Sequence, residues 1–135
     1  MAHLHPTGHH HHPERPERLA ILLEALGGAT GGIRASREQI ERVHDVAYVE
    51  TIASIHEETW LDGDTLAGPT TWDAARLAAG CAIAAVEAGS FALVRPPGHH
   101  ALRGHAMGFC IFDNIAVAAR YAQDALGIER VAIVD

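Results

Sequence analysis

Several common features of protein sequences are scarce in this chain of 135 residues. It has two cysteines, Cys81 and Cys110, which are too few for a disulfide framework. Lys and Arg total 10 against 17 acidic residues, and the net charge of −7 argues against nucleic acid or an anionic membrane as partner. No apolar run is long enough to cross a bilayer, and the N-terminus lacks the apolar core of a signal peptide. These absences predict a reduced, cytoplasmic protein.

Apolar residues make up 48% of the chain, which is enough to predict one folded domain over residues 1–135. The chain also contains 11 histidines, of which His9, His10, His11 and His12 are consecutive. A purification tag is one interpretation of that run. A tag is usually longer and ends in a linker, whereas this run continues directly into Pro13-Glu14-Arg15, so the sequence favours a native origin.

Helices are predicted from apolar residues at helical spacing and from residues that favour helix ends. Ser36 with Gln39, and Thr70 with Asp73, fit the capping-box pattern. Asp45 and Asp113 are the expected N-caps of two further helices. The expected helices span residues 13–26, 36–43, 45–60, 72–88 and 114–126, and a polar loop is expected over 61–69.

Two short apolar runs, residues 91–95 and 131–135, are predicted to be buried strands. A strand, a long loop, a helix and a second strand form a right-handed crossover in a parallel sheet. Ligands bind at the carboxyl ends of such strands. This topology predicts that His99 or His100 lies near Asp135.

The loop over residues 95–110 joins these elements and contains the tandem histidines His99 and His100. Histidine titrates near neutral pH, so one ring can act as a base and the other as an acid beside an activated water. A carboxylate behind one ring, such as Asp135, would fix its tautomer. Two loop histidines that only bond the backbone are an equally good interpretation of the residue types alone.

Other candidate residues also have a plainer interpretation. Gly108 and Phe109 can form the wall of a pocket for an aliphatic group, although core packing of Phe109 is the simpler account. Asp62 and Asp64 can meet substrate from a rim loop or form a solvated turn. Arg18 is a buried or a surface arginine, and its residue type favours the surface.

In combination these residues resemble the histone deacetylase and acetylpolyamine amidohydrolase superfamily, most closely its bacterial and class II-like branch. The resemblance covers nearly the whole chain. The motifs that carry it are His12-Pro-Glu-Arg-Pro-Glu-Arg-Leu19, Leu61-Asp-Gly-Asp-Thr65, Ala92-Leu-Val-Arg-Pro-Pro-Gly-His-His-Ala101, Met107-Gly-Phe-Cys-Ile-Phe-Asp-Asn114 and Val131-Ala-Ile-Val-Asp135. It implies an α/β fold with three layers around a parallel sheet, the arginase-deacetylase fold, of which this chain is the N-terminal part.

The resemblance also implies roles for particular residues. His99 and His100 correspond to the tandem histidines that activate a zinc-bound water and protonate the leaving amine. Asp135 corresponds to the aspartate behind the first histidine, which also helps to bind a monovalent cation, usually potassium. Gly108 and Phe109 then line the acyl-lysine tunnel. Asp62 or Asp64 is the rim acid, and Arg18 is the buried arginine near the internal channel.

The usual zinc ligands of this superfamily follow the aspartate that Asp135 matches, and the sequence contains none of them. Three interpretations therefore remain open. The chain is a hydrolase of a small acylated substrate with a rebuilt metal site, for which His9, His10, His11 and His12 are candidate substitute ligands. Alternatively, it is a non-catalytic interaction module, or one half of a split enzyme. An unpaired sheet edge also predicts a homo-oligomer.

Overall fold

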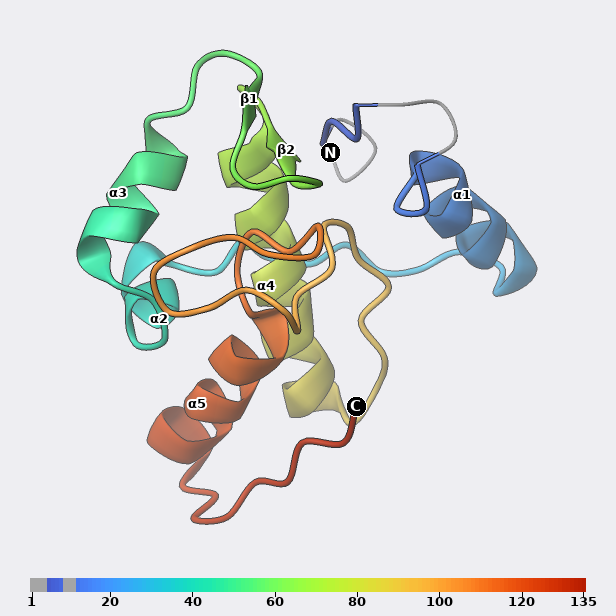
Figure 1. The fold of residues 1–135 in the computed structure, drawn as a ribbon. Helices are drawn as coiled ribbons and strands as arrows, with labels where there is room; N and C mark the ends of the chain where they lie inside the picture. Colours follow the sequence, from blue (N-terminus) through green and yellow to red (C-terminus); the bar gives the residue numbers. More distant parts are fainter. Residues whose placement is uncertain (1–4, 9–11) are drawn as a thin grey trace.

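The computed structural model describes residues 5–8 and 12–135. Its regular elements, shown in Figure 1, are mainly helical, with a single short hairpin. In chain order they are α1 (Pro16–Ala25), α2 (Arg37–Glu41), α3 (Val46–Ala53), β1 (Thr59–Trp60), β2 (Leu66–Ala67), α4 (Thr71–Ala88) and α5 (Asn114–Leu126). None of the helices in these residues is both long and apolar enough to cross a membrane.

Helix α4 runs through the middle of the molecule, and α5 packs directly against it. Helices α2 and α3 lie beside this pair, while α1 lies on the other side and buries none of its residues. The core forms where α2, α3, α4 and α5 meet the end of the loop that contains His99 and His100. Its buried members are Ala35, Ile40, Val49, Ile52, Ala75, Ala79, Ile83, Ile111, Phe112 and Val117.

Most of the predicted helix ends are confirmed. Helix α5 spans residues 114–126 as predicted, and the Asp113 carboxylate accepts a hydrogen bond from Ala116 N at 2.9 Å. Gly127 closes the helix in the left-handed conformation, with φ of 68°. The capping box of Ser36 and Gln39 is also present, with both of its hydrogen bonds.

Two predicted caps and one predicted helix length are wrong. Asp73 does not complete a capping box with Thr70; its carboxylate pairs with Arg34 Nε at 3.1 Å. Asp45 precedes α3, but its carboxylate accepts from Arg103 Nε at 2.7 Å. Helix α3 ends at Ala53 rather than near residue 60, and the expected polar loop lies within the β1–β2 hairpin.

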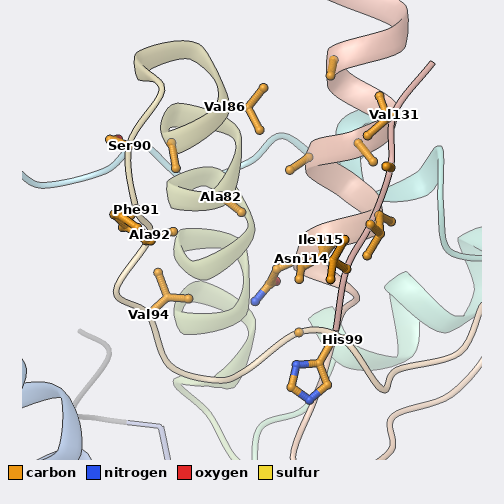
Figure 2. A pocket seen from close by; sticks show the side chains of 18 of the residues that line it. Ala82, Val86, Ser90, Phe91, Ala92, Val94, His99, Asn114, Ile115 and Val131 are labelled. Atoms are coloured by element: carbon orange, nitrogen blue, oxygen red, sulfur yellow. The ribbon is translucent and has the colours of Figure 1, made fainter. Parts of the chain in front are cut away.

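The two predicted buried strands, residues 91–95 and 131–135, are open chain rather than paired strands. Among the described residues, no main-chain hydrogen bond joins 91–94 or 131–134 to another segment. Phe91 is 96% exposed and Val134 is 92% exposed. Apolar sequence alone does not form a strand, because a strand needs a neighbour to pair with. Figure 2 shows that helices α4 and α5 lie between these two segments.

The long loop between residues 95 and 113 is held in place by side chains from the helical part. His44, which is 1% exposed, forms hydrogen bonds with two separate points of this loop. Its Nδ1 donates to the Arg103 carbonyl at 3.2 Å, and its Nε2 accepts from Asp113 N at 2.9 Å. A carbonyl can only accept, so these partners fix the neutral imidazole with its proton on Nδ1. Tyr48 adds a hydrogen bond from its hydroxyl to the Ile111 carbonyl at 2.7 Å.

We predict that His44→Leu destabilises the chain without changing its helices. Leucine fills much of the space but leaves the Asp113 N–H without its acceptor. A buried main-chain group that loses its partner costs about 1–3 kcal/mol. Urea unfolding should show this loss, whereas His56→Leu, at an exposed histidine, should leave the free energy of unfolding nearly unchanged. Equal stability of the two variants would contradict the role assigned to His44.

Candidate active site at the tandem histidines

His99 and His100 lie next to each other with their rings edge to face. The ring centroids are 4.1 Å apart, and the planes are inclined by 81°. The loop reaches this point through Gly98, where any Cβ would lie only 2.3 Å from Asn114 Cγ. Only glycine allows the backbone to approach the start of α5 this closely. Both histidines are exposed, so water and solutes can reach them.

Asp135 lies beside His99, although the two strands of the predicted crossover are open chain. The distance from His99 Nδ1 to Asp135 Oδ1 is 4.0 Å, which suits an ion pair but is too long for a hydrogen bond. The side chains of His99 and Asp135 are 40% and 72% exposed. Water therefore screens the attraction between them, and the pair is weak in this structure.

A tight turn at Gly108 and Phe109 forms the wall beside His100. Met107 and Cys110 exchange two main-chain hydrogen bonds of 3.1 and 3.0 Å, with Gly108 and Phe109 between them. Both central residues have positive φ, 55° for Gly108 and 67° for Phe109, as in a type I′ turn. A phenylalanine in this conformation is uncommon and costs about 1–3 kcal/mol. The turn therefore needs support from its surroundings.

That support comes from the acidic loop between the two short strands. Thr65, which is 1% exposed, accepts a hydrogen bond from Phe109 N at 3.0 Å through its hydroxyl oxygen. Thr65 is in turn held by Asp62, whose carboxylate accepts from Thr65 N at 2.6 Å and from Asp64 N at 2.9 Å. Desolvation raises the pKa of Asp62, but the hydrogen bonds from the main chain and side chains of Asp64 and Thr65 together outweigh it and hold the pKa below its ordinary value.

The acidic loop and the turn border an open pocket of about 430 Å³. Its lining residues are Asp62, Gly63, Asp64, His100, Met107 and Gly108. The structure thus brings His100 and Gly108 together with both predicted rim acids. Phe109 is half-buried on the far side of the turn, where its ring meets the His12 ring edge to face at 4.5 Å.

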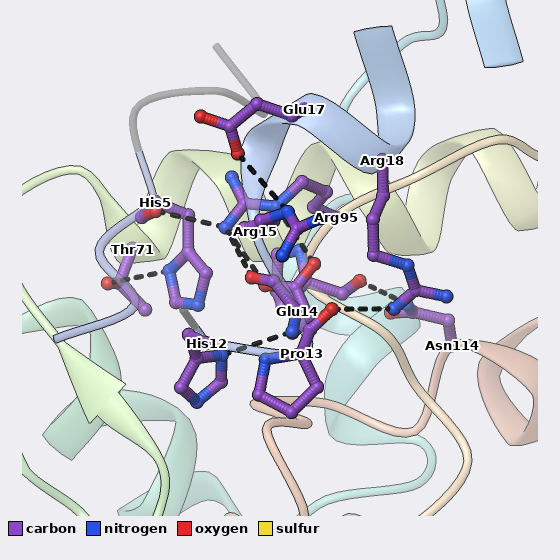
Figure 3. A network of polar contacts seen from close by, with 11 residues as sticks. His5, His12, Pro13, Glu14, Arg15, Glu17, Arg18, Thr71, Arg95 and Asn114 are labelled. Atoms are coloured by element: carbon purple, nitrogen blue, oxygen red, sulfur yellow. Dashed lines mark hydrogen bonds and ion pairs between the residues drawn. The ribbon is translucent and has the colours of Figure 1, made fainter. Parts of the chain in front are cut away.

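The segment before the histidines is anchored by the buried network in Figure 3. Glu14 accepts two hydrogen bonds from Arg95, from Nε at 2.8 Å and from Nη2 at 2.9 Å. Arg95 is 2% exposed and also donates to the His5 carbonyl at 3.2 Å. Next to it, His5 Nδ1 lies 3.2 Å from the Thr71 hydroxyl. Burial lowers the pKa of His5 to about 3, with further lowering from the charges of Arg95 and His12.

Arg18 does not have the buried position that the resemblance implies. Its side chain is exposed and donates from Nη1 to the Pro13 carbonyl at 3.2 Å. The buried arginine of this region is Arg95, which the sequence argument treated only as part of a motif. Its place as the last residue of a predicted buried strand, directly before two prolines, was a signal that could have marked it as an anchor.

The described residues do not supply a zinc site. No group of three or more His, Cys, Asp or Glu side chains in residues 5–8 and 12–135 is arranged to hold a metal ion. Of the suggested substitute ligands, His12 uses Nδ1 to accept from Glu14 N at 3.1 Å, and His9, His10 and His11 lie outside the described residues. The predicted potassium at Asp135 stays a prediction.

The chain is similar in sequence and in fold to known proteins. The crystal structure of the HDA15 HD domain matches with a TM-score of 0.81 at 36% identity, covering 92% of this chain and 42% of that chain. A histone deacetylase-like amidohydrolase of Pseudomonas aeruginosa is 41% identical in an alignment of 144 positions that covers 96% of this chain and 38% of the relative. The human polyamine deacetylase HDAC10 is 37% identical in an alignment of 145 positions that covers 90% of this chain and 22% of that protein.

These likenesses define the fold as part of the arginase-deacetylase fold, as the sequence predicted. The family model described as the histone deacetylase domain matches residues 12–135. The chain belongs to the histone deacetylase domain family, and it spans less than half the length of these relatives. The chain has similar identities to a bacterial and a human relative, so its assignment to the bacterial branch stays a prediction.

We predict that Gly108→Ala disturbs His100 and destabilises the turn. The added Cβ would lie 2.8 Å from His100 Cδ2, and alanine is strained at a φ of 55°. The expected loss is about 1 kcal/mol or more. Gly63→Ala is the matched control, because Gly63 lines the same pocket and a Cβ there meets nothing within 4 Å. Thermal unfolding measures the loss, and a shifted His100 ring signal in NMR spectra, absent from the control, would identify its cause.

We predict that acid weakens the fold through His5. Its pKa is about 3 in the folded chain and near 6.5 when unfolded, so the unfolded state takes up the proton first. The contribution of His5 is complete above pH 6.5 and is lost as the pH falls toward 3, by about 1.4 kcal/mol per pH unit. His5→Gln should flatten this dependence in urea unfolding, and His56→Gln should not. A slope that is unchanged in His5→Gln would contradict the assignment.

Proposed function

We propose that this chain contributes the proton-transfer part of a deacetylase-like hydrolase that cleaves acyl-amide or ester bonds. The observation that carries the proposal is the edge-to-face pair of His99 and His100, with His100 lining the pocket and Asp135 beside His99. Near neutral pH one imidazole takes a proton from the attacking water, and the other gives a proton to the leaving group.

The substrate side of the proposal rests on the open pocket. Its wall at Met107 and Gly108 offers an apolar surface for an aliphatic chain. Asp62 and Asp64 at its mouth offer carboxylates that can accept hydrogen bonds from the backbone of an acylated peptide or from an amine. An acylated amine or a small ester is thus the substrate class we propose. The free thiols Cys81 and Cys110 fit the cytoplasmic location that we propose for it.

Zinc is expected from the family, but the described residues do not form its site. Without a metal, the histidine pair must activate ordinary water, which suffices for a reactive ester but not for an acetyl-lysine amide. The ligands for amide cleavage would come from a complementing part of the domain. We propose such a partner, or a second copy of the chain, as the route to full activity.

We predict that the purified chain hydrolyses an activated ester, p-nitrophenyl acetate, through this pair. His100→Asn should lower the rate on the order of 10²-fold, which is the lower range for general acid–base catalysis. His105→Asn is the matched control, an exposed histidine of the same loop that lines neither the pocket nor the cavity between residues 91–94 and 131–134. The acetyl-lysine amide should stay intact in both, with or without added zinc. Ester cleavage that survives His99→Asn and His100→Asn together would refute the proposal.

A second candidate function is a non-catalytic binding module. It is favoured by the lack of a metal cluster in the described residues and by the large exposed apolar side chains near the C-terminus of α5. A chain inert to the ester in all forms would leave this function as the better description.

A further inference from the structure

Thr65 lies behind the wall of the open pocket rather than in it. Its side chain is 1% exposed and does not line the pocket. Its main chain is held on both sides, because Asp62 Oδ1 accepts from Thr65 N at 2.6 Å and the Thr65 carbonyl accepts from Leu61 N at 2.8 Å. The hydroxyl of Thr65 therefore extends from a fixed backbone.

The two partners of this hydroxyl determine where its proton lies. Phe109 N can only donate, so the Thr65 oxygen accepts this hydrogen bond, at 3.0 Å. The single hydroxyl proton is then donated to Asp64 Oδ1, at 3.2 Å. The two hydrogen bonds form one chain, in which each bond polarises the next. The negative charge of Asp64 thus makes Thr65 a stronger acceptor for the turn.

This chain of hydrogen bonds connects two parts of the open pocket. Asp64 lines the pocket directly, and its Oδ2 has no hydrogen-bond partner among the described residues. At the other end, Phe109 N bonds to Thr65 and to no other group in the described part of the chain. Gly108 precedes it and lies against the His100 ring, since a Cβ at Gly108 would be 2.8 Å from His100 Cδ2. A change in the bond to Thr65 would therefore alter the wall beside His100.

The conformation of Phe109 makes this bond decisive for the position of the wall. Phe109 has a φ of 67°, which residues with a side chain rarely adopt. If its N–H lost the acceptor, the N–H would turn toward water, and relief of the backbone strain would favour the same movement. A valine at position 65 would keep the branched shape of threonine but remove both hydrogen bonds. The wall thus depends on the hydroxyl of Thr65 and not only on its packing.

We propose that Thr65 is a positioning residue that couples the Asp64 carboxylate to the wall beside His100. A substrate group that donates to the open oxygen of Asp64 draws charge away from Thr65, which weakens the bond from Phe109 N. The wall then responds to what binds at the mouth of the pocket. The proposal deepens the proposed function and rests on it, because it adds a positioning residue and a means of regulation to the same pocket.

The test observes the turn directly, by NMR spectroscopy of the full chain. Thr65→Val should speed hydrogen exchange at the Phe109 amide on the order of tenfold and shift the His100 ring signals. Thr65→Ser keeps the hydroxyl and should restore both. Thr71→Val is the matched control, because the Thr71 hydroxyl is also buried and also accepts from a main-chain N–H, that of Gly68 at 2.8 Å. It should lower the stability by a similar amount but leave Phe109 and His100 unchanged.

A double-mutant cycle tests the coupling to the carboxylate. Asp64 is exposed, so Asp64→Ala should fold normally. This substitution should speed exchange at the Phe109 amide about threefold, because Thr65 is then a weaker acceptor. In the Thr65→Val background it should have no further effect, because the connecting hydroxyl is missing. If Thr65→Val does not fold, the response of the Phe109 amide to Asp64→Ala alone decides the proposal.

Several results would overturn this role of Thr65. They are an unchanged Phe109 amide in Thr65→Val or Asp64→Ala, a Thr65→Ser variant that behaves like Thr65→Val, equal changes in Thr65→Val and Thr71→Val, and a full effect of Asp64→Ala in the Thr65→Val background. None of these measurements needs hydrolysis. A turn that responds as expected in a chain that does not cleave p-nitrophenyl acetate would sink the proposed function and leave the role of Thr65 standing. Cleavage of the ester with an unresponsive turn would do the reverse.

Discussion

The hydrogen bonds of one buried imidazole, His44, are the constraint on which the site most depends. The loop from residue 95 to residue 113 has little regular structure, so its backbone must find partners elsewhere. His44 donates to the Arg103 carbonyl and accepts from Asp113 N, so it holds both ends of the part of this loop that contains the turn at Gly108 and Phe109. Burial lowers its pKa, which keeps the ring neutral and both bonds available. The position of the loop thus follows from the helical core.

The remaining anchors work in the same way and come from distant parts of the chain. Glu14 holds Arg95, and Thr65 holds the turn at Phe109. The bidentate ion pair of Glu14 and Arg95 is buried, so each charge would be costly without the other. A network of this kind holds exposed histidines in place while their rings stay accessible. Order at the site is therefore maintained by residues that do not touch the pocket where chemistry is proposed.

The sequence predicted the local elements well because their signals are local. Asp113 and Gly127 mark both ends of α5, and Ser36 with Gln39 marks the start of α2. The prediction of strands at 91–95 and 131–135 was wrong, because strand pairing depends on chain that is far away or not among the described residues. The roles of His44 and Arg95 were missed for a related reason. A buried polar residue is recognised by its partners, and 59 to 81 positions separate these residues from theirs.

The two adjacent histidines face different surroundings, and this division has a consequence for proton traffic. His100 lines the open pocket, whereas His99 lines the apolar cavity between residues 91–94 and 131–134. Both rings are exposed, so each can exchange protons with water from its own side of the loop. Only the path at His100 adjoins the pocket in which substrate binding is proposed, so a substrate bound there leaves the path at His99 open to water.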